Sequence, residues 1–370
     1  MDFSGFTAIY GGPGTGKTAL AASIAHRRLA DGQRVLWVTF YEDKQTLIDS
    51  MAKLGYDLNG ADIWEAVLAD PTSTFNQISH LVSHSPPNLF VLDSISQLQM
   101  PDVRQNLTNL FYRAFKFAGI DAIVISEEPP GPLAHIADNL IRLSLEFTER
   151  GVPVRRMYVQ KARGRPAGYV REFEMVEGVG IVFLDELAPR PRGASALQMG
   201  VSKLDEFVAG AKSALVVGDS SADLLAAEWA ASLARSGRKV LFRTYRGQAP
   251  PAVKSADVAV DFLSADPARY GVHIYDLVRR VDEVGADVVF YEGVEVEALA
   301  YGRRLAYELN AKKLSALRKA GVALVLVGAR SYGLESLVDV RAVARRSAVV
   351  FIRPFAPPIS CKLSGGVPTC

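Results

Sequence analysis

The sequence has little that would suit a secreted, membrane-spanning or broadly nucleic-acid-binding protein. Only two of its 370 residues are cysteines, too few for a disulfide framework. No apolar stretch approaches the roughly 20 residues that span a bilayer, and the N-terminus shows no basic segment or cleavage site. Charged residues make up 22% of the chain with a net charge of only +2, so no general field attracts nucleic acid or anionic lipid. We therefore expect a cytoplasmic globular protein without a membrane partner.

The two cysteines, Cys361 and Cys370, lie close together near the C-terminal end. A disulfide between them is one interpretation, because intracellular proteins of hyperthermophiles do carry disulfides. We favour the other interpretation, two solvent-exposed thiols. The histidines are dispersed without the spacing of metal ligands, so no zinc site is expected.

What the sequence does contain is a regular alternation of apolar runs and helical patterns. Phe6–Tyr10 and 34–40 read as strands on either side of a helix over 18–29, and strands follow at 88–93 and 122–126, which is typical of a mostly parallel sheet flanked by helices. Further helices are predicted over 44–54, 73–83 and 106–118. From residue 139 two-residue periodicity in 140–147, 154–161 and 169–175 predicts antiparallel strands at the sheet edge.

The pattern then begins again after the Pro-rich basic segment 188–193. Strand and helix patterns at 214–218 and 224–233 repeat the first ones, and 236–242 matches 31–37 at an offset of 205 residues, which relates Gly32 to Gly237. A repeat this long indicates two copies of one domain fold. We predict an α/β chain of two tandem domains, 1–187 and 197–370, joined by a linker over 188–196.

A phosphate-binding loop follows the first predicted strand. Gly11-Gly12-Pro13-Gly14-Thr15-Gly16-Lys17-Thr18 satisfies the Walker A pattern G-x-x-x-x-G-K-T, in which backbone N–H groups and the N-terminus of the next helix cradle phosphates. Lys17 is expected to reach the outer phosphates, and Thr18 to offer its hydroxyl to Mg²⁺. The first domain is therefore predicted to bind a nucleoside triphosphate.

Acidic residues at two other strand ends complete the predicted site. Asp93 ends an apolar run and is expected to join Thr18 in holding Mg²⁺, although Asp-Ser could also cap the following helix. Glu42 and Asp43 end the second strand on the same edge of the sheet as the loop, where ligands bind. They are candidates for polarising the attacking water, and the alternative is that they stabilise the first turn of the next helix.

These features together resemble the KaiC family of RecA-like P-loop ATPases over nearly the whole chain. The resemblance lies in the P-loop, the strand end Tyr41-Glu42-Asp43, the pair Asp93-Ser94, the segment Lys161-x-Arg163-Gly164 and the duplication. It implies that ATP is the nucleotide. The choice of ATP over GTP depends on the resemblance, because the sequence has no motif that reads the base. It also implies that Glu42 acts on the hydrolytic water with Asp43 in support.

The resemblance further implies a hexameric ring with ATP between subunits. Lys161 and Arg163 would then stabilise transition-state charge on the neighbour's triphosphate, while the alternative is a solvated basic face. In the second copy the loop has become Gly218-Asp219-Ser220-Ser221-Ala222-Asp223-Leu224, without the lysine, and Arg246-Gly247 stands where Glu42 is expected. We therefore predict two RecA-like domains of which only the first binds nucleotide.

Three functions are compatible with these features. The favoured one is a regulatory or assembly ATPase with one site per chain, whose second domain binds a protein client. The first alternative is a RadA/RecA-like ATPase on single-stranded DNA, disfavoured because the segment 127–132 is acidic and proline-rich and 96–101 carries no cation. The second is a slow nucleotide-gated interaction scaffold.

Overall fold

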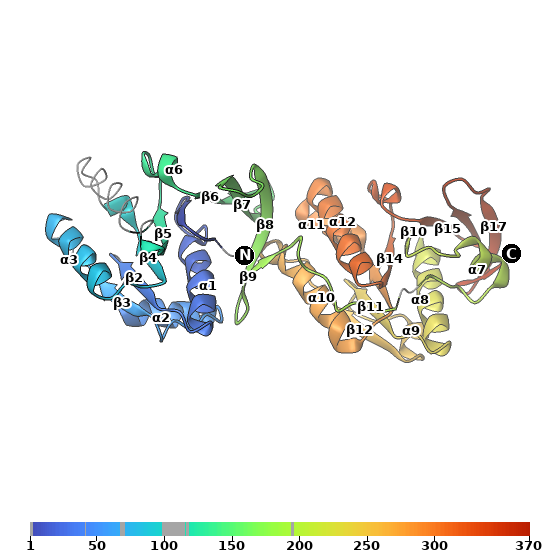
Figure 1. Ribbon diagram of the computed structural model, residues 1–370. Helices are drawn as coiled ribbons and strands as arrows, with labels where there is room; N and C mark the ends of the chain where they lie inside the picture. The colour runs from blue at the N-terminus through green and yellow to red at the C-terminus, as the bar shows by residue number, and fades with distance from the viewer. Residues whose placement is uncertain (1–2, 41, 67–70, 98–114, 116–117, 194–195) are drawn as a thin grey trace. The chain divides into compact units, whose positions relative to one another are not determined.

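Each half of the sequence folds around its own nine-stranded sheet (Figure 1). The computed structural model describes residues 3–40, 42–66, 71–97, 115, 118–193 and 196–370. One unit comprises Met1–Glu146 and Val154–Phe183, and the other comprises Phe147–Pro153 and Leu184–Cys370. The helix expected over 106–118 lies almost wholly outside the described residues.

The first unit alternates strands and helices as far as β6 and then continues as strands. Its strands are β1 (Phe6–Tyr10), β2 (Val35–Thr39), β3 (Asp62–Glu65), β4 (Leu89–Asp93), β5 (Asp121–Ser126), β6 (Asn139–Phe147), β7 (Pro153–Ala162), β8 (Tyr169–Val176) and β9 (Gly180–Phe183). The helices of its described residues are α1 (Lys17–Ala30), α2 (Lys44–Lys53), α3 (Pro71–His84) and α6 (Leu133–Ile136), with the 3₁₀ turn η1 (Ile95–Gln97).

The sheet of this unit has the strand order β3-β2-β4-β5-β1-β6-β7-β8-β9. Its central strands are buried on both faces: in β2, Trp37 packs in the cluster that holds Leu47 of α2, whereas Val38 packs in the cluster that holds Ile78 of α3. Strands covered on both faces need continuous apolar runs, which explains why β1, β2 and β4 read as such in the sequence.

The second unit repeats this arrangement. Its strands are β10 (Ser213–Gly218), β11 (Val240–Thr244), β12 (Val258–Phe262), β13 (Val288–Glu292), β14 (Ala323–Gly328), β15 (Val340–Arg345), β16 (Ala348–Ile352), β17 (Ile359–Ser364) and β18 (Val367–Thr369). Its helices are α7 (Ser202–Phe207), α8 (Ser220–Arg235), α9 (Pro251–Lys254), α10 (Val272–Val284), α11 (Val294–Tyr301) and α12 (Arg303–Lys319), with 3₁₀ turns η3 (Pro267–Arg269) and η4 (Leu334–Ser336).

The strand order of the second sheet is β12-β11-β13-β14-β10-β15-β16-β17-β18, the order of the first sheet strand for strand. The predicted α/β fold of two tandem RecA-like domains is thereby confirmed. The antiparallel edge predicted for the first domain is present from β7 to β9, and the second domain has one too, where β15 to β18 pair antiparallel. One detail of the prediction was wrong, because β6 pairs in parallel with β1.

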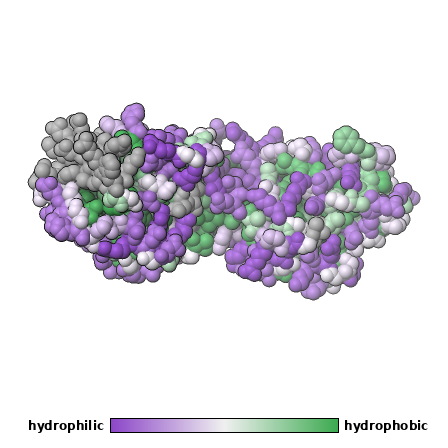
Figure 2. All heavy atoms as spheres, viewed as in Figure 1, coloured by the Kyte–Doolittle hydropathy of each residue, from purple (hydrophilic) through white to green (hydrophobic). Residues whose placement is uncertain are grey.

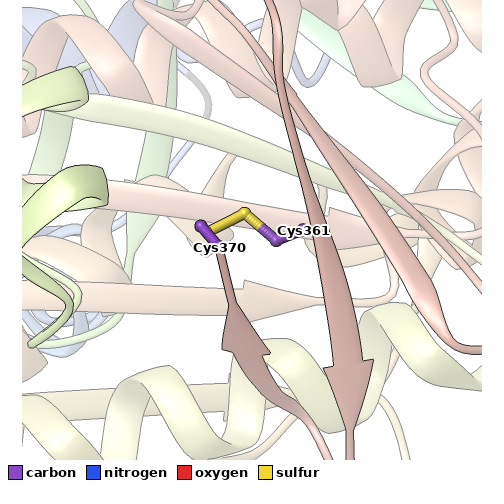
Figure 3. The surroundings of a disulfide bond; sticks show 2 residues. All are labelled: Cys361 and Cys370. Atoms are coloured by element: carbon purple, nitrogen blue, oxygen red, sulfur yellow. A yellow bond between two sulfur atoms is a disulfide. The ribbon is translucent and has the colours of Figure 1, made fainter.

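The favoured interpretation of the cysteines was also wrong. Cys361 and Cys370 form a disulfide (Figure 3), and Cys361 is buried in the core of the second unit. Cys361 lies on β17, and Cys370 directly follows β18, which pairs with β17. The bond therefore links two neighbouring strands at the sheet edge.

The surface of the protein is mainly polar on the face drawn in Figure 2, where hydrophilic residues predominate. Within the described part of the chain, no helix combines the length and apolar character needed to cross a membrane.

Candidate nucleotide site

The loop after β1 is built around glycines that other residues could not replace. Gly11 has φ +151°, and a Cβ atom there would collide with the carbonyl oxygen of Leu143 on β6. Gly16, with φ +98°, ends the loop where α1 begins. Among the described residues no side chain caps this helix, so the N–H groups of its first turn are directed at the space above the loop. An uncapped helix N-terminus beside a glycine loop suits an anion such as phosphate.

Lys17 lies across this loop. Its Nζ donates hydrogen bonds to the carbonyl oxygens of Gly11, at 2.7 Å, and Gly12, at 2.9 Å, and Thr15 Oγ1 also donates to Gly12 O. Burial lowers the pKa of Lys17, and the negative charges of Glu127 and Asp93 oppose that shift. The ammonium group therefore stands over the loop, within reach of any phosphate held there.

Thr18 and Asp93 meet at the base of the loop. Thr18 Oγ1, in the first turn of α1, donates to Asp93 Oδ2 at the end of β4, at a distance of 2.8 Å. Burial raises the pKa of Asp93 to about 6, with a further contribution from the charge of Glu42, while the Thr18 hydrogen bond opposes the shift. Hydroxyl and carboxylate oxygens are the donors that Mg²⁺ prefers, and a cation would offset the cost of burying this carboxylate, so the pair fits Mg²⁺ beside bound phosphates.

The raised pKa of Asp93 would make metal binding at this pair sensitive to pH. Mg²⁺ requires the ionised carboxylate, so protons compete with it once the pH falls below about 6. We expect the apparent Mg²⁺ affinity, titrated at saturating ATP, to fall more steeply between pH 7 and 5 in the wild type than in Asp93→Asn, which removes the titrating group. The exposed Asp62→Asn serves as control, and equal slopes in wild type and Asp93→Asn would contradict the assignment.

Glu42 and Asp43 lie at the carboxyl end of β2, beside β4. The backbone of Glu42 is fixed by Thr39: Glu42 N donates to Thr39 Oγ1 at 3.3 Å, and that hydroxyl donates back to Glu42 O at 3.1 Å. The Glu42 side chain is exposed, and its charge acts on Asp93. Asp43 is the N-cap of α2, since its carboxylate accepts from Thr46 N and Thr46 Oγ1. The structure thus shows Asp43 fixing the start of α2 directly after Glu42.

Glu127 is a residue of the site that the sequence prediction did not include. It follows β5, whose Ser126 is in register with Tyr10 at the end of β1, and its charge acts on Lys17. Its backbone N–H donates to Ser96 Oγ at 2.8 Å. In the sequence, the acidic segment that begins at Glu127 served only as an argument against DNA binding. The rule that ligands bind at the carboxyl ends of parallel strands could also have placed Glu127 at the site.

Lys161 and Arg163 lie away from the loop of their own chain. Lys161 Nζ donates to His135 O at 2.9 Å, and Arg163 Nε is 3.1 Å from Asp138 Oδ1. Both contacts are near Asn139, where β6 begins, and Thr7 near the start of β1 is in register with Asn139. The phosphate loop follows the other end of β1. The structure thus places the contacts of both residues by the start of β1, whereas the loop follows its end.

The matching region of the second unit has no phosphate loop. Gly218 keeps the conformation of Gly11, with φ +156° and a Cβ position blocked by the carbonyl oxygen of Ala344. Only Asp219 separates β10 from α8, and its side chain caps that helix by accepting from Ser221 N. The second Asp219 oxygen accepts from Arg346 N. A carboxylate of the chain itself thus occupies the helix N-terminus, where the first unit leaves room for phosphate.

A guanidinium stands at the position of the predicted metal in the second unit. At the 205-residue offset Asp223 matches Thr18, and Glu292 ends β13 as Asp93 ends β4. Arg246 contacts both, with Nη2 at 2.5 Å from Asp223 Oδ2 and Nε at 3.2 Å from Glu292 Oε1. Thr244 Oγ1 donates to the second Glu292 oxygen. A single guanidinium therefore contacts both carboxylates at the place where the first unit is predicted to hold the metal.

The strand order and the glycine loop with Lys17, Thr18 and Asp93 define the first unit as a RecA-like P-loop ATPase domain. The profile of the family described as "ATPase: KaiC" matches residues 4–188, half of the chain. The chain therefore belongs to the KaiC ATPase family. No curated protein matches the sequence closely enough to narrow this assignment.

Proposed function

We propose that the protein binds and hydrolyses Mg-ATP at one site per chain, in the first unit, and that it acts in the cytoplasm as a regulatory or assembly ATPase. The observation that carries this proposal is the hydrogen bond between Thr18 and Asp93 beside the uncapped N-terminus of α1, where Lys17 also contacts the loop. In the second unit the corresponding positions are filled by the Arg246 contacts and the Asp219 cap. Nucleotide chemistry is therefore assigned to the first unit alone.

Each residue has a separate role in this proposal. The loop N–H groups and Lys17 bind and orient the phosphates, and Thr18 with Asp93 would hold Mg²⁺, which when bound neutralises charge on the phosphate oxygens. Glu42 orients the attacking water and accepts its proton. Asp43, as the cap of α2, positions Glu42.

The experiment that tests nucleotide binding is Lys17→Met. A hydrogen bond to a charged group contributes about 1.5–3 kcal/mol, so loss of the lysine is expected to weaken Mg-ATP binding roughly 10- to 150-fold in equilibrium titration. Lys53→Met is the matched control, because Lys53 is exposed on α2 of the same unit. Unchanged affinity in Lys17→Met, or an equal loss in the control, would contradict the proposed site.

We further propose that Lys161 and Arg163 act on the triphosphate of a neighbouring subunit in a hexameric ring. Their position supports this, because their contacts lie by the start of β1 and the loop of their own chain follows its end. Mg-ATP is then expected to convert the protein to hexamers in light scattering, and Lys161→Met combined with Arg163→Met is expected to abolish turnover.

A mixing experiment separates this role from a structural one. Lys17→Met subunits lack a working loop but keep Lys161 and Arg163, and the double variant has the opposite defect. Mixed rings bring one intact loop beside one intact basic pair, so combining the two inactive proteins is expected to restore part of the ATPase activity. A fully active monomer, or no recovery on mixing, would remove both residues from the site.

The scaffold alternative has a specific observation in its favour. The second unit retains the whole nine-stranded fold while Arg246, Asp223 and Glu292 fill its former site. A domain kept without nucleotide chemistry suits binding of a protein client. Turnover that becomes measurable only with a client would favour the scaffold, and fast turnover of the isolated protein would favour the ATPase.

A further inference from the structure

A pocket of about 640 Å³ opens in the second unit, away from the region that matches the nucleotide site. It lies between the edge strand β12 with its continuation to Asp266 and one side of helix α10. Its wall includes Arg243, which reaches it from β11, the neighbour of β12. Nothing in the proposed ATPase function uses this pocket.

Arg243 is the unusual member of the wall. The residue is only 4% exposed, its Nε lies 3.2 Å from Asp261 Oδ2, and its Nη1 is buried without a hydrogen-bond partner among the described residues. A buried donor left unpaired costs about 1–3 kcal/mol, and more when it is charged. A guanidinium presents its N–H groups as a fork that matches a carboxylate, so Arg243, although its Nε faces Asp261, keeps an N–H group for which the described residues supply no acceptor.

The other charged residues around the pocket leave one carboxylate in excess. Apart from Arg243, three arginines and four carboxylates line it, and most are paired with each other, as in Arg280 Nε with Asp261 Oδ1 at 2.8 Å and Arg269 Nη2 with Asp276 Oδ2 at 3.2 Å. A dianion such as phosphate would be repelled by the four carboxylates. A ligand with one negative and one positive group is accommodated by both signs.

One polar side chain of the wall is fixed by a hydrogen bond to a residue outside the pocket. His273, at the start of α10, lines the pocket, and its Nε2 is 2.5 Å from the hydroxyl of Tyr301. Burial lowers the pKa of His273 to about 4, so the imidazole is neutral at physiological pH and adds no charge. Fixed polar groups of this kind provide orientation for a small ligand.

We propose that this pocket binds a free amino acid, whose carboxylate pairs with Arg243 and whose ammonium group pairs with the acidic residues of the wall. The ligand class follows from one unsatisfied guanidinium nitrogen, one carboxylate in excess among the other charged residues of the lining, and a volume suited to a small molecule.

The test is calorimetric titration of the full chain, without nucleotide, with each standard amino acid. At least one is expected to bind, and its decarboxylated amine, its N-acetyl derivative and inorganic phosphate are expected to bind more weakly. Arg243→Met is expected to weaken the binding roughly 10- to 100-fold, because a hydrogen bond to a charged group is lost. Absence of binding by every amino acid, or tighter binding of phosphate, would overturn the proposal.

Two further variants test the proposal even if the Arg243→Met protein does not fold. Ser264→Trp fills the pocket from an exposed position and leaves the ion pairs intact, so it is expected to abolish binding. Arg235→Met removes an exposed arginine on α8, outside the pocket, and is expected to bind as the wild type does. Wild-type binding by Ser264→Trp would overturn the proposal whatever the behaviour of Arg243→Met.

Discussion

Replacing Glu42 with glutamine is expected to lower the ATP turnover number by roughly 10²–10⁴-fold, the range that general base catalysis contributes, while ATP still binds. The amide keeps the size of the side chain but cannot accept a proton from water. The loop groups that bind phosphate, Lys17 above all, are untouched, so affinity is expected to change little.

The measurement is phosphate release at saturating Mg-ATP together with a separate titration of nucleotide binding. Glu177→Gln is the matched control, because Glu177 is an exposed carboxylate in the turn between β8 and β9 of the same unit. If Glu42→Gln hydrolyses ATP at the wild-type rate, the water-activating role belongs to another group, and Glu127, whose charge acts on Lys17, becomes the first candidate.

Much of the candidate nucleotide site could be predicted from the sequence, because its residues either form one segment or end neighbouring strands. Gly11 to Thr18 form one uninterrupted segment, and the carboxyl ends of parallel strands must meet at one edge of a sheet. That rule places Asp93 and Glu42 beside the loop from the order of the strands alone, and the Thr18–Asp93 contact agrees with it. The same rule applied to β5 would have added Glu127.

Other features depend on contacts that residue patterns do not encode. The alternation in β6 reflects which of its faces is buried, and it says nothing of the direction of its neighbour, so the parallel pairing with β1 was missed. The Cys361–Cys370 bond depends on the pairing of β17 with β18. The contacts of Arg246 with Asp223 and Glu292 depend on a side-chain conformation. Each joins groups whose approach is set by tertiary packing.

Disrupting a buried ion pair in the second unit is expected to have a large effect on the stability of that unit. Glu297 on α11 and Lys313 on α12 are both fully buried, with Nζ 2.5 Å from Oε1. The carboxylate also accepts from the Tyr245 hydroxyl and from Asn310 Nδ2, each at 2.8 Å. Lys313→Met is expected to lower the free energy of unfolding of this unit by about 3–5 kcal/mol, because it leaves a buried charge without its partner.

Urea unfolding followed through Trp229 fluorescence measures this loss, provided that Trp37 and Trp64 of the first unit are replaced with Phe. Adding Glu297→Gln to Lys313→Met removes the unpaired charge and is expected to recover most of the stability. Arg304→Met is the control, because its side chain is 91% exposed in the pair with Glu308 and such pairs contribute about 0–1 kcal/mol.

The pH dependence of the deficit distinguishes a lost charge partner from lost packing. Burial alone would raise the pKa of Glu297, but the charge and hydrogen bond of Lys313 hold it below its ordinary value. In the wild type this stabilisation is present above the unfolded pKa of the carboxyl and is lost as the pH falls through the lower folded value. Without Lys313 the pKa of Glu297 rises, and the carboxyl is protonated at a higher pH. The deficit of Lys313→Met is therefore expected to be largest near neutral pH and to shrink in acid, whereas a deficit independent of pH would show that the lysine acts through packing alone.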